Sequence, residues 1–576
     1  MAAIASPPNF AAWICSTRSD SRRFLAVTRL HRDRPMNRQL RIVCSRLNSS
    51  RSSGNVSPDN GGDLQYELQY GFSPRKGSPV FVTLPIDVVG AAGQVRRKKA
   101  MAQSFRALSA AGVEGVVMEV WWGVVEKVEP GVYNWEGYME IVAMARKYGL
   151  KVRAVMAFHQ CGSGPEDPYW ISLPQWVVEE INRDPDIAYS DRFGRRSMEY
   201  ISLGCDNLPV LRGRSPIQVY ADFMRNFRDT FRLLFDTTIT GIRVGMGPAG
   251  ELRYPLCPTQ KLLAWRSDEL GEFQCYDKYM LASLNACAGE IGMREWGNGG
   301  PIGASCLSQN HEETEFFKSD EGSWNTPYGK FFLGWYSSML LLHGERICRE
   351  AETIFRGTGV IMSAKVAGIH WHYSTQSHPS ELTAGYYNTS TRDGLLPIAR
   401  MLGRYGFTLC CTCFEMLDKN VKQMNLISSP EGLLKQLLLA VRICNLPLEG
   451  ENCTTRLDDE SYEQVIRTSK LYSSSLDRPS FSFNFVRMDK NLFEYQNWVR
   501  FTRFVRQMSY TNIFRARLDF GGNMFPPSTA NGGKLGLAMA DSKMLLLCKT
   551  ATIKLHTEIR WPGSLPMPPN YRPPSL

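Results

Sequence analysis

The chain has 576 residues, of which 43% are hydrophobic, and its formal net charge at pH 7 is +11. It contains no run of about eighteen apolar residues, so we expect no membrane-spanning helix. The charge is concentrated at one end, because residues 1–54 contribute +8 and leave +3 for the remainder. No zinc-finger spacing or basic helix with base-reading residues occurs either, so we expect no nucleic-acid partner.

The first 54 residues have the composition of an organelle transit peptide. They contain ten Arg, no Lys and only Asp20 and Asp33 as acids, together with many Ser. They lack the unbroken apolar core of about 7–15 residues that a secretory signal requires. A disordered N-terminus without a targeting role is the alternative, and composition does not separate mitochondria from plastids. Residues 55–78 are polar and contain Gly, Ser and Pro, which predicts a linker.

Eight apolar runs follow the linker, with helical segments between them. Several runs are almost continuously apolar, which is typical of parallel strands buried on both faces. Helical patterns at 96–111, 136–148 and 216–234 separate some of them. This alternation predicts an α/β fold, a (β/α)8 TIM barrel over residues 79–520 with long loops at its C-terminal rim. The predicted strand runs are 79–87, 113–123, 151–160, 241–247, 360–372, 407–416, 441–448 and 481–488.

A glycine-rich turn follows the fourth run, in the stretch GMGPAGELRYP at 245–255. Its Gly-x-Gly-x-x-Gly spacing matches the dinucleotide-binding fingerprint, which requires a helix directly behind the last glycine. Two prolines within the next eight residues break a helix there. We therefore expect no nucleotide cofactor, and interpret the glycines as a sharp turn that fixes Glu251 at the rim of the barrel.

Polar and charged residues recur at or just beyond the C-terminal ends of the predicted strands. Barrel enzymes build their active sites at this rim. Two unpaired carboxylates that face one site suit glycoside hydrolysis, and Trp and Tyr at the rim suit stacking on sugar rings. The rim residues are Glu119, Trp121, Trp122, His159, Glu251, His370, Glu415, Glu451 and Arg487.

The fifteen cysteines are scattered and odd in number, as in a chain that keeps free thiols in a reducing compartment. No second cysteine pair or His cluster has zinc spacing, so no metal is expected. His370 and His372 would share one face of a strand, which leaves a metal site as an alternative without a third ligand.

Ten stretches between residues 79 and 507 make the chain resemble the plant β-amylases, glycoside hydrolases that remove maltose from the non-reducing ends of α-1,4-glucans. The resemblance implies a (β/α)8 barrel, an α-1,4-glucan such as starch or maltodextrin as substrate, no cofactor, and a plastid location. The matching stretches are MEVWWGVVE (118–126), FHQCG (158–162), GMGPAGELRYP (245–255), GEFQCYDKYM (271–280), GKFFLGWYS (329–337), KVAGIHWHY (365–373), ELTAGYYN (381–388), RDGLLPIARML (392–402), TCFEM (412–416) and LEGEN (448–452).

By this resemblance, Glu251 is the general acid that protonates the leaving glycosidic oxygen, and Glu451 is the base that activates a water on the opposite face. This inverting arrangement requires room for the water, a raised pKa for the acid and an ionised base. Glu415 matches a supporting residue. The remaining matches to glucan-binding positions are Glu119, His159, Asp167, Lys365, His370, Thr412, Asn452, Cys453 and Arg487.

Three departures from the family pattern support an alternative function. The family's lid sequence HQCGGNVGD is HQCGSGPED here, at 159–167, and Pro165 restricts its closure. The family's aspartate before Val-Trp-Trp is Glu119, and its alanine after Asn452 is Cys453. The lid and the Met-Glu-Val-Trp-Trp stretch resemble a plastid branch of β-amylase-like proteins that lack measurable activity. The alternative is therefore a non-catalytic glucan-binding or regulatory protein that acts with other proteins of starch metabolism.

Two further points concern the flanks of the barrel. Some relatives carry an added DNA-binding region and act as sugar-sensing transcription factors. We do not expect this function here, because no such region precedes the barrel and the chain after residue 54 is nearly neutral. Residues 521–576 are rich in Gly and Pro and match no feature of the family, so the sequence predicts no structure for this tail.

Overall fold

We analysed a computed structural model, which describes residues 77–162, 164–256, 271–304, 314–319, 322–421, 427–454, 456–473, 481–509 and 542–552. The chain divides into two compact units, Met1–Arg75 and Lys76–Leu576, and all described residues belong to the second. The predicted transit segment (1–54) and linker (55–78) thus lie outside the described residues, apart from Gly77 and Ser78.

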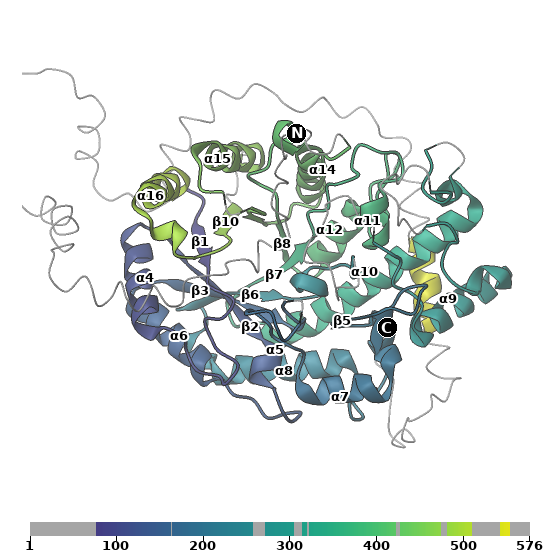
Figure 1. Cartoon of the computed structure of the whole chain (residues 1–576), viewed down its shortest axis with the longest axis horizontal. Coiled ribbons are helices and arrows are strands. Elements are labelled where there is room, and N and C mark those ends of the chain that lie inside the picture. The colour runs from purple at the N-terminus through teal and green to yellow at the C-terminus, as the bar shows by residue number, and fades with distance from the viewer. Residues whose placement is uncertain are drawn as a thin grey trace, which may run out of the picture. The chain divides into compact units, whose positions relative to one another are not determined.

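Eight strands close a barrel in which every strand runs parallel to both neighbours (Figure 1). This confirms the predicted (β/α)8 fold. The barrel strands are β1 (Val80–Thr83), β2 (Gly115–Trp121), β3 (Lys151–Ala157), β6 (Ile239–Val244), β7 (Ile361–Val366), β8 (Thr408–Cys411), β9 (Leu448–Glu451) and β10 (Phe481–Phe485).

A major helix follows each barrel strand and lies outside the barrel (Figure 1). Among the described residues, no helix is both long enough and apolar enough to cross a membrane. The outer helices are α4 (Lys98–Ala110), α6 (Glu136–Lys147), α8 (Pro216–Thr230), α10 (Pro327–Phe355), α12 (Leu395–Arg404), α14 (Pro430–Ile443), α15 (Asp459–Ser473) and α16 (Tyr495–Ser509). Further inserted elements are α5 (Trp122–Val125), α7 (Gln175–Arg183), α9 (Lys278–Glu290), α11 (Pro379–Thr383), α13 (Asp418–Val421) and the antiparallel pair β4 (Ala188–Ser190) and β5 (Arg196–Ile201).

Three outer helices begin with the same local signal, a Ser or Thr followed by Pro. Ser215 caps α8 by accepting the backbone N–H of Gln218, whose side chain in turn accepts the N–H of Ser215. Thr326 caps α10 and Ser429 caps α14 in the same way, each through the backbone N–H three residues on. The proline at the first helical position costs no hydrogen bond, so these caps fix where the helices start.

The seventh predicted strand run, 441–448, is wrong in its boundaries. Val441 to Ile443 complete helix α14, Asn445 has a φ of 51°, and β9 begins only at Leu448. The buried residues Leu434, Leu437, Leu438 and Val441 instead form one helical face. A short apolar run at the end of an amphipathic helix has the same local pattern as a buried strand, which explains the error.

The interior of the barrel contains charged side chains as well as apolar ones. Phe81, Val117 and Val155 form a small apolar layer there. The guanidinium of Arg153, on β3, lies 3.7 Å from the centroid of the Phe81 ring. It also donates to the side chain of Asn484 at 2.9 Å. The barrel interior thus contains a layer of hydrogen-bonded polar side chains next to the apolar layer. The sequence did not indicate this polar layer, because the strand runs are almost wholly apolar.

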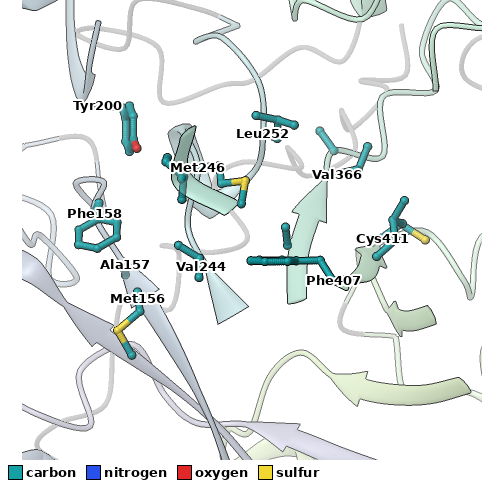
Figure 2. Packing of buried hydrophobic residues seen from close by; sticks show 14 of the residues in the cluster. Met156, Ala157, Phe158, Tyr200, Val244, Met246, Leu252, Val366, Phe407 and Cys411 are labelled. Carbon is teal, nitrogen blue, oxygen red and sulfur yellow. The ribbon is translucent and has the colours of Figure 1, made fainter. Parts of the chain in front are cut away.

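The main apolar core lies between the strands and the outer helices. Met156 of β3 is in register with Val244 of β6, and both side chains are buried. Figure 2 shows them together with Phe158 and Met246, which follow the two strands. Packing at this level fixes the point where β3 and β6 end, and therefore the start of the two loops that carry His159 and Glu251.

Part of the C-terminal tail is helical. Residues 542–552 form a helix in which Cys548 and Ala551 are buried. Lys549 Nζ lies 2.9 Å from a carboxylate oxygen of Glu345 on α10, so the helix packs against that element. The sequence predicted no structure for this tail, because the helix lies outside every stretch that resembles the family.

Candidate active site

The turn that carries Glu251 is shaped by close backbone contacts. It leaves β6 at Val244 and forms a short 3-10 segment, Pro248–Gly250. A Cβ atom on Gly247 would lie 2.4 Å from the carbonyl oxygen of Glu251, and Gly250 has a φ of 72°. After the turn, Leu252 N–H donates to the carbonyl of Lys365 at 2.9 Å. The glycines therefore serve backbone geometry, as predicted, and the described chain up to 256 forms no helix behind them.

The carboxylate of Glu251 is held by two cations. Arg253 Nε lies 2.8 Å from Oε2, and Lys365 Nζ lies 3.4 Å from Oε1. Burial raises the pKa of Glu251, but Lys365 and then Arg253 outweigh it and hold the pKa below its usual value. The expectation of a raised pKa for the acid is therefore wrong, because the two cations stabilise the ionised form more than burial disfavours it.

Glu451, at the end of β9, is bound even more tightly. Arg243 NH1 lies 2.5 Å from Oε1, and Lys365 Nζ lies 3.1 Å from Oε2. Burial raises the pKa of Glu451, but Arg243 and Lys365 together lower it to about 2. Glu451 is thus ionised at neutral pH, as the role of base that the resemblance implies would require.

Lys365 brings the two carboxylates together. Its ammonium contacts an oxygen of each, so these two oxygens lie no further apart than the sum of 3.4 and 3.1 Å. Lys365 was predicted as a glucan-binding residue, and the structure places it between the two carboxylates.

At the inner side of the site, Glu119 and Arg487 bind each other. Arg487 donates to both carboxylate oxygens of Glu119, at 2.8 and 3.1 Å, and to the carbonyl of Leu84 at 2.8 Å. His159 packs edge-on against Trp121, with ring centroids 5.1 Å apart. Burial lowers the pKa of His159 to about 4, so this side chain is uncharged at neutral pH. Glu119 and Arg487, both predicted to bind the glucan, therefore already bind each other.

The loop after Glu451 is organised by Glu415. The carboxylate of Glu415 accepts the backbone N–H groups of Cys453, at 3.0 Å, and Thr454, at 2.5 Å, which agrees with a supporting role. Asn452 accepts the N–H of Val486 at 2.7 Å, so it joins the β9 loop to the segment that carries Arg487.

Three of the predicted binding residues have local contacts of their own. Thr412 Oγ1 lies 3.5 Å from Cys413 Sγ at the end of β8. Asp167 accepts the N–H of Tyr169 and thereby shapes its own turn in the lid segment. His370 lies 2.7 Å from Ser428 Oγ, and burial lowers its pKa to about 4.

The proposed pair His370 and His372 does not gather a third ligand. Across the described parts of the chain, no group of three or more His, Cys, Asp or Glu side chains has the geometry to hold a metal ion. His372 lies 2.5 Å from Ser380 Oγ, a different partner from that of His370.

Sequence reasoning missed three charged residues at this site. Arg243 and Glu449 lie inside the barrel and form an ion pair of 2.6 Å. Arg253 follows the turn that carries Glu251. The available signal was a charged residue within a strand run, as in Gly-Ile-Arg-Val for Arg243 and Leu-Glu-Gly-Glu for Glu449.

A parallel (β/α)8 barrel with two carboxylates that share one lysine at its C-terminal rim is the arrangement of a glycoside hydrolase of the two-carboxylate class. Residues 81–512 match the model of glycosyl hydrolase family 14, and the chain belongs to that family. This confirms the resemblance drawn from the ten sequence stretches.

Curated relatives agree with this assignment. The chain is 52% identical to "Beta-amylase 1, chloroplastic" of Arabidopsis thaliana over 436 residues, which covers 75% of this chain and 76% of the relative. It is 51% identical to the rice protein "Beta-amylase 1, chloroplastic" over 439 residues, covering 76% and 81%. Among solved structures, the catalytic domain of β-amylase from Paenibacillus polymyxa matches with a TM-score of 0.61 and 21% identity, covering 76% of this chain and all of that one. That structure supports the fold.

Proposed function

We propose that the chain is a β-amylase-type hydrolase of the plastid that releases β-maltose from the non-reducing ends of α-1,4-glucans. The observation that carries this proposal is the shared contact of Glu251 and Glu451 with Lys365 at the C-terminal rim. Family membership and the relatives named as chloroplastic β-amylases support the substrate class and the location.

In this mechanism the two carboxylates have opposite tasks. Glu451, kept ionised by Arg243 and Lys365, accepts a proton from a water that attacks the anomeric carbon. Glu251 gives a proton to the glycosidic oxygen as the bond to the leaving chain breaks. Because the water attacks on the face opposite the leaving group, the product has the inverted, β configuration.

Glu251 needs a proton before it can act as an acid. Lys365 and Arg253 oppose that protonation, so their hold on the Glu251 carboxylate must weaken when the glucan is bound. A bound sugar covers the carboxyl group and excludes water, which favours the neutral form. The charges around Arg253 therefore decide how readily Glu251 is protonated.

The alternative is a glucan-binding protein without turnover that acts with other proteins of starch metabolism. The contact between Arg487 and Glu119 favours it, because a side chain that matches a glucan-binding residue already has a protein partner. Pro165 in the lid segment also favours it, since a proline restricts the backbone rotation that closure requires.

The deciding experiment measures maltose release from soluble starch by the full chain. Glu251→Gln and Glu451→Gln should each lower kcat by about 1,000-fold while maltoheptaose still binds in calorimetry. Glu179→Gln, on the exposed surface of α7, serves as the matched control. Proton NMR of the fresh product should show the β anomer. Equal loss of binding and turnover would overturn the assigned roles, and binding without turnover in the unmodified chain would establish the alternative.

A further inference from the structure

The backbone pairing between β6 and β7 resumes after the turn that carries the acid. The two strands pair first along their lengths, the chain then leaves the ladder over residues 245–250, and Glu251 pairs with Lys365. Beyond this pair, the Leu252 N–H donates to the Lys365 carbonyl at 2.9 Å. The side chains of Glu251 and Lys365, which contact each other at 3.4 Å, therefore come from backbone positions that are paired as in a sheet.

The hydroxyl of Tyr386 occupies the next position of that ladder. In a parallel ladder, the next hydrogen bond would run from the Ala367 N–H to the Leu252 carbonyl. Here the Tyr386 hydroxyl accepts the Ala367 N–H at 2.9 Å and donates to the Leu252 carbonyl at 2.8 Å. Figure 2 shows Leu252 and Val366, the residue before Ala367, on the two segments that the hydroxyl joins. Two hydrogen bonds through one oxygen atom span more than the single bond of about 2.9 Å that they replace, so the hydroxyl is a spacer between these segments.

The loop that carries Tyr386 is itself held in place. The Tyr386 side chain is 1% exposed, and its backbone N–H donates to the carbonyl of Glu381 on α11 at 2.8 Å. The preceding Gly385 has a φ of 97°, and a Cβ atom there would lie 2.6 Å from Cδ2 of the Tyr254 ring. Burial raises the pKa of the Tyr386 hydroxyl, which therefore keeps its proton and can both donate and accept. The spacer is thus fixed by packing as well as by its two hydrogen bonds.

The two segments that the spacer joins carry the partners of the acid carboxylate. The Leu252 carbonyl belongs to the peptide group between Leu252 and Arg253, and Arg253 Nε binds the Glu251 carboxylate at 2.8 Å. The Arg253 N–H also donates to the Glu251 carbonyl at 2.9 Å, which closes a γ-turn at Leu252. On the other segment, Ala367 lies two residues after Lys365, the second cation on Glu251. The separation of the two segments therefore bears on both contacts of the Glu251 carboxylate.

We propose that Tyr386 is a positioning residue for the general acid, whose hydroxyl keeps the segment after Glu251 and the end of β7 at a fixed separation and so sets where Glu251 lies relative to Lys365. The proposal rests on the acid role given to Glu251 above. Both hydrogen bonds of the hydroxyl join it to backbone groups, so Tyr386 acts through the backbone and does not contact the reacting atoms in this assignment.

Tyr386→Phe removes the spacer oxygen and keeps the ring. Leu252 and Ala367 are buried, and an unpaired backbone group is unfavourable there, so the two segments should close until they bond each other directly. A displacement of about 1 Å at a catalytic group can cost about a hundredfold in rate. We therefore expect kcat for maltoheptaose to fall about tenfold to hundredfold, with KM within about twofold of the unmodified chain, because the change acts on the acid and not on ground-state binding.

Tyr336→Phe, on α10, is the matched control. The Tyr336 side chain is also 1% exposed, and its hydroxyl likewise accepts one backbone N–H, of Gln274 at 3.0 Å, and donates to one backbone carbonyl, of Thr383 at 3.2 Å. Both variants lose the same kind of hydrogen bonds, so their melting temperatures should fall by similar amounts. Only Tyr386→Phe should lose kcat, with Tyr336→Phe remaining within about twofold. An equal loss of kcat in both variants would overturn the inference, as would a loss in Tyr386→Phe that appears in KM alone.

Crystal structures of the unmodified chain and of Tyr386→Phe test the spacer without turnover. In the variant, the Ala367 nitrogen and the Leu252 oxygen should lie about 3 Å apart, and the distance between Lys365 Nζ and the Glu251 carboxylate should change by about 0.5–1 Å. A Glu251 carboxylate that keeps its distances from Lys365 and Arg253 would contradict the inference. Failure of maltose release in the unmodified chain would instead reject the proposed function and leave this structural test intact.

Discussion

Replacing Arg243 removes the cation that holds the base in its ionised form. Arg243 lies inside the barrel with a side chain only 7% exposed, and its guanidinium binds Glu451 at 2.5 Å and Glu449 at 2.6 Å. Arg243→Met keeps most of the length of the side chain and removes the charge. Two buried carboxylates then lose their strongest common partner, and they still repel each other.

The size of the effect follows from the titration of Glu451. Its pKa of about 2, against 4.5 for a free glutamate, corresponds to about 3 kcal/mol of favourable interaction with the ionised form. Lys365 supplies part of this, but Glu449 also loses its contact with Arg243. We therefore expect Arg243→Met to lower the free energy of unfolding at pH 7 by about 3–5 kcal/mol.

The pH dependence has a definite sign. The pKa of Glu451 is lower in the folded protein than in the unfolded chain, so its contribution is complete above pH 4.5 and is lost as the pH falls towards 2. The difference between Arg243→Met and the unmodified chain should thus narrow by about 1 kcal/mol from pH 7 to pH 4.

Urea unfolding at both pH values measures this difference, with Arg225→Met as the control. Arg225 forms exposed ion pairs with Asp222 and Glu350 on the outer surface, and its loss should cost no more than about 1 kcal/mol. A loss below about 1 kcal/mol for Arg243→Met at pH 7, or a difference that does not narrow at pH 4, would refute the reasoning.

Three further changes test other parts of the site. Glu119→Asp shortens the partner of Arg487 by one methylene and should free Arg487 for the glucan, so maltoheptaose should bind about threefold to tenfold more tightly in calorimetry. An unchanged affinity would show that Glu119 does not compete with the glucan for Arg487. Replacing residues 163–166 by Gly-Asn-Val-Gly should raise maltose release if Pro165 restricts the lid, and an unchanged rate would direct attention to Glu119 and Cys453. The pKa of His370 is about 4 in the folded protein and about 6.5 in the unfolded chain, so protonation of the unfolded chain favours unfolding as the pH falls below 6.5. His370→Phe should therefore reduce the decline in melting temperature between pH 6.5 and pH 4. An equal decline in the variant and the unmodified chain would contradict that pKa.

The sequence predicted those parts of the fold that are encoded by local pattern. Eight apolar runs separated by helices identified the barrel, because parallel strands covered on both faces need apolar residues on most positions. The same logic failed at 441–448, where the buried face of α14 ends next to β9. A pattern of apolar residues does not tell a helix end from a strand start without the turn at Asn445.

The candidate site was proposed from residue identity, and the lowered pKa of Glu251 was not foreseen. Glu251 and Glu451 were found because their local motifs are long and specific. The lowered pKa of Glu251 depends on Lys365, which is more than a hundred residues away in sequence and reaches the acid only when β6 and β7 pair. Similarly, Glu119 meets Arg487 only because the barrel closes between β1 and β10. The lowered pKa of Glu251 and the contact between Glu119 and Arg487 depend on distances between charged groups. Those distances are defined only when the barrel has closed.

The charged groups form one alternating series of ion pairs from the barrel interior to Arg253, and this order gives the acid and the base separate partners. The base is next to two cations, so removing Arg243 raises the pKa of Glu451 and moves the acidic limb of the kcat/KM profile upward. The acid is next to Lys365 and Arg253, so removing Arg253 raises the pKa of Glu251 and moves the alkaline limb of the profile upward. Substitutions of the two arginines should therefore move the two limbs of the pH profile separately. In order, the series is Arg153, Glu449, Arg243, Glu451, Lys365, Glu251 and Arg253.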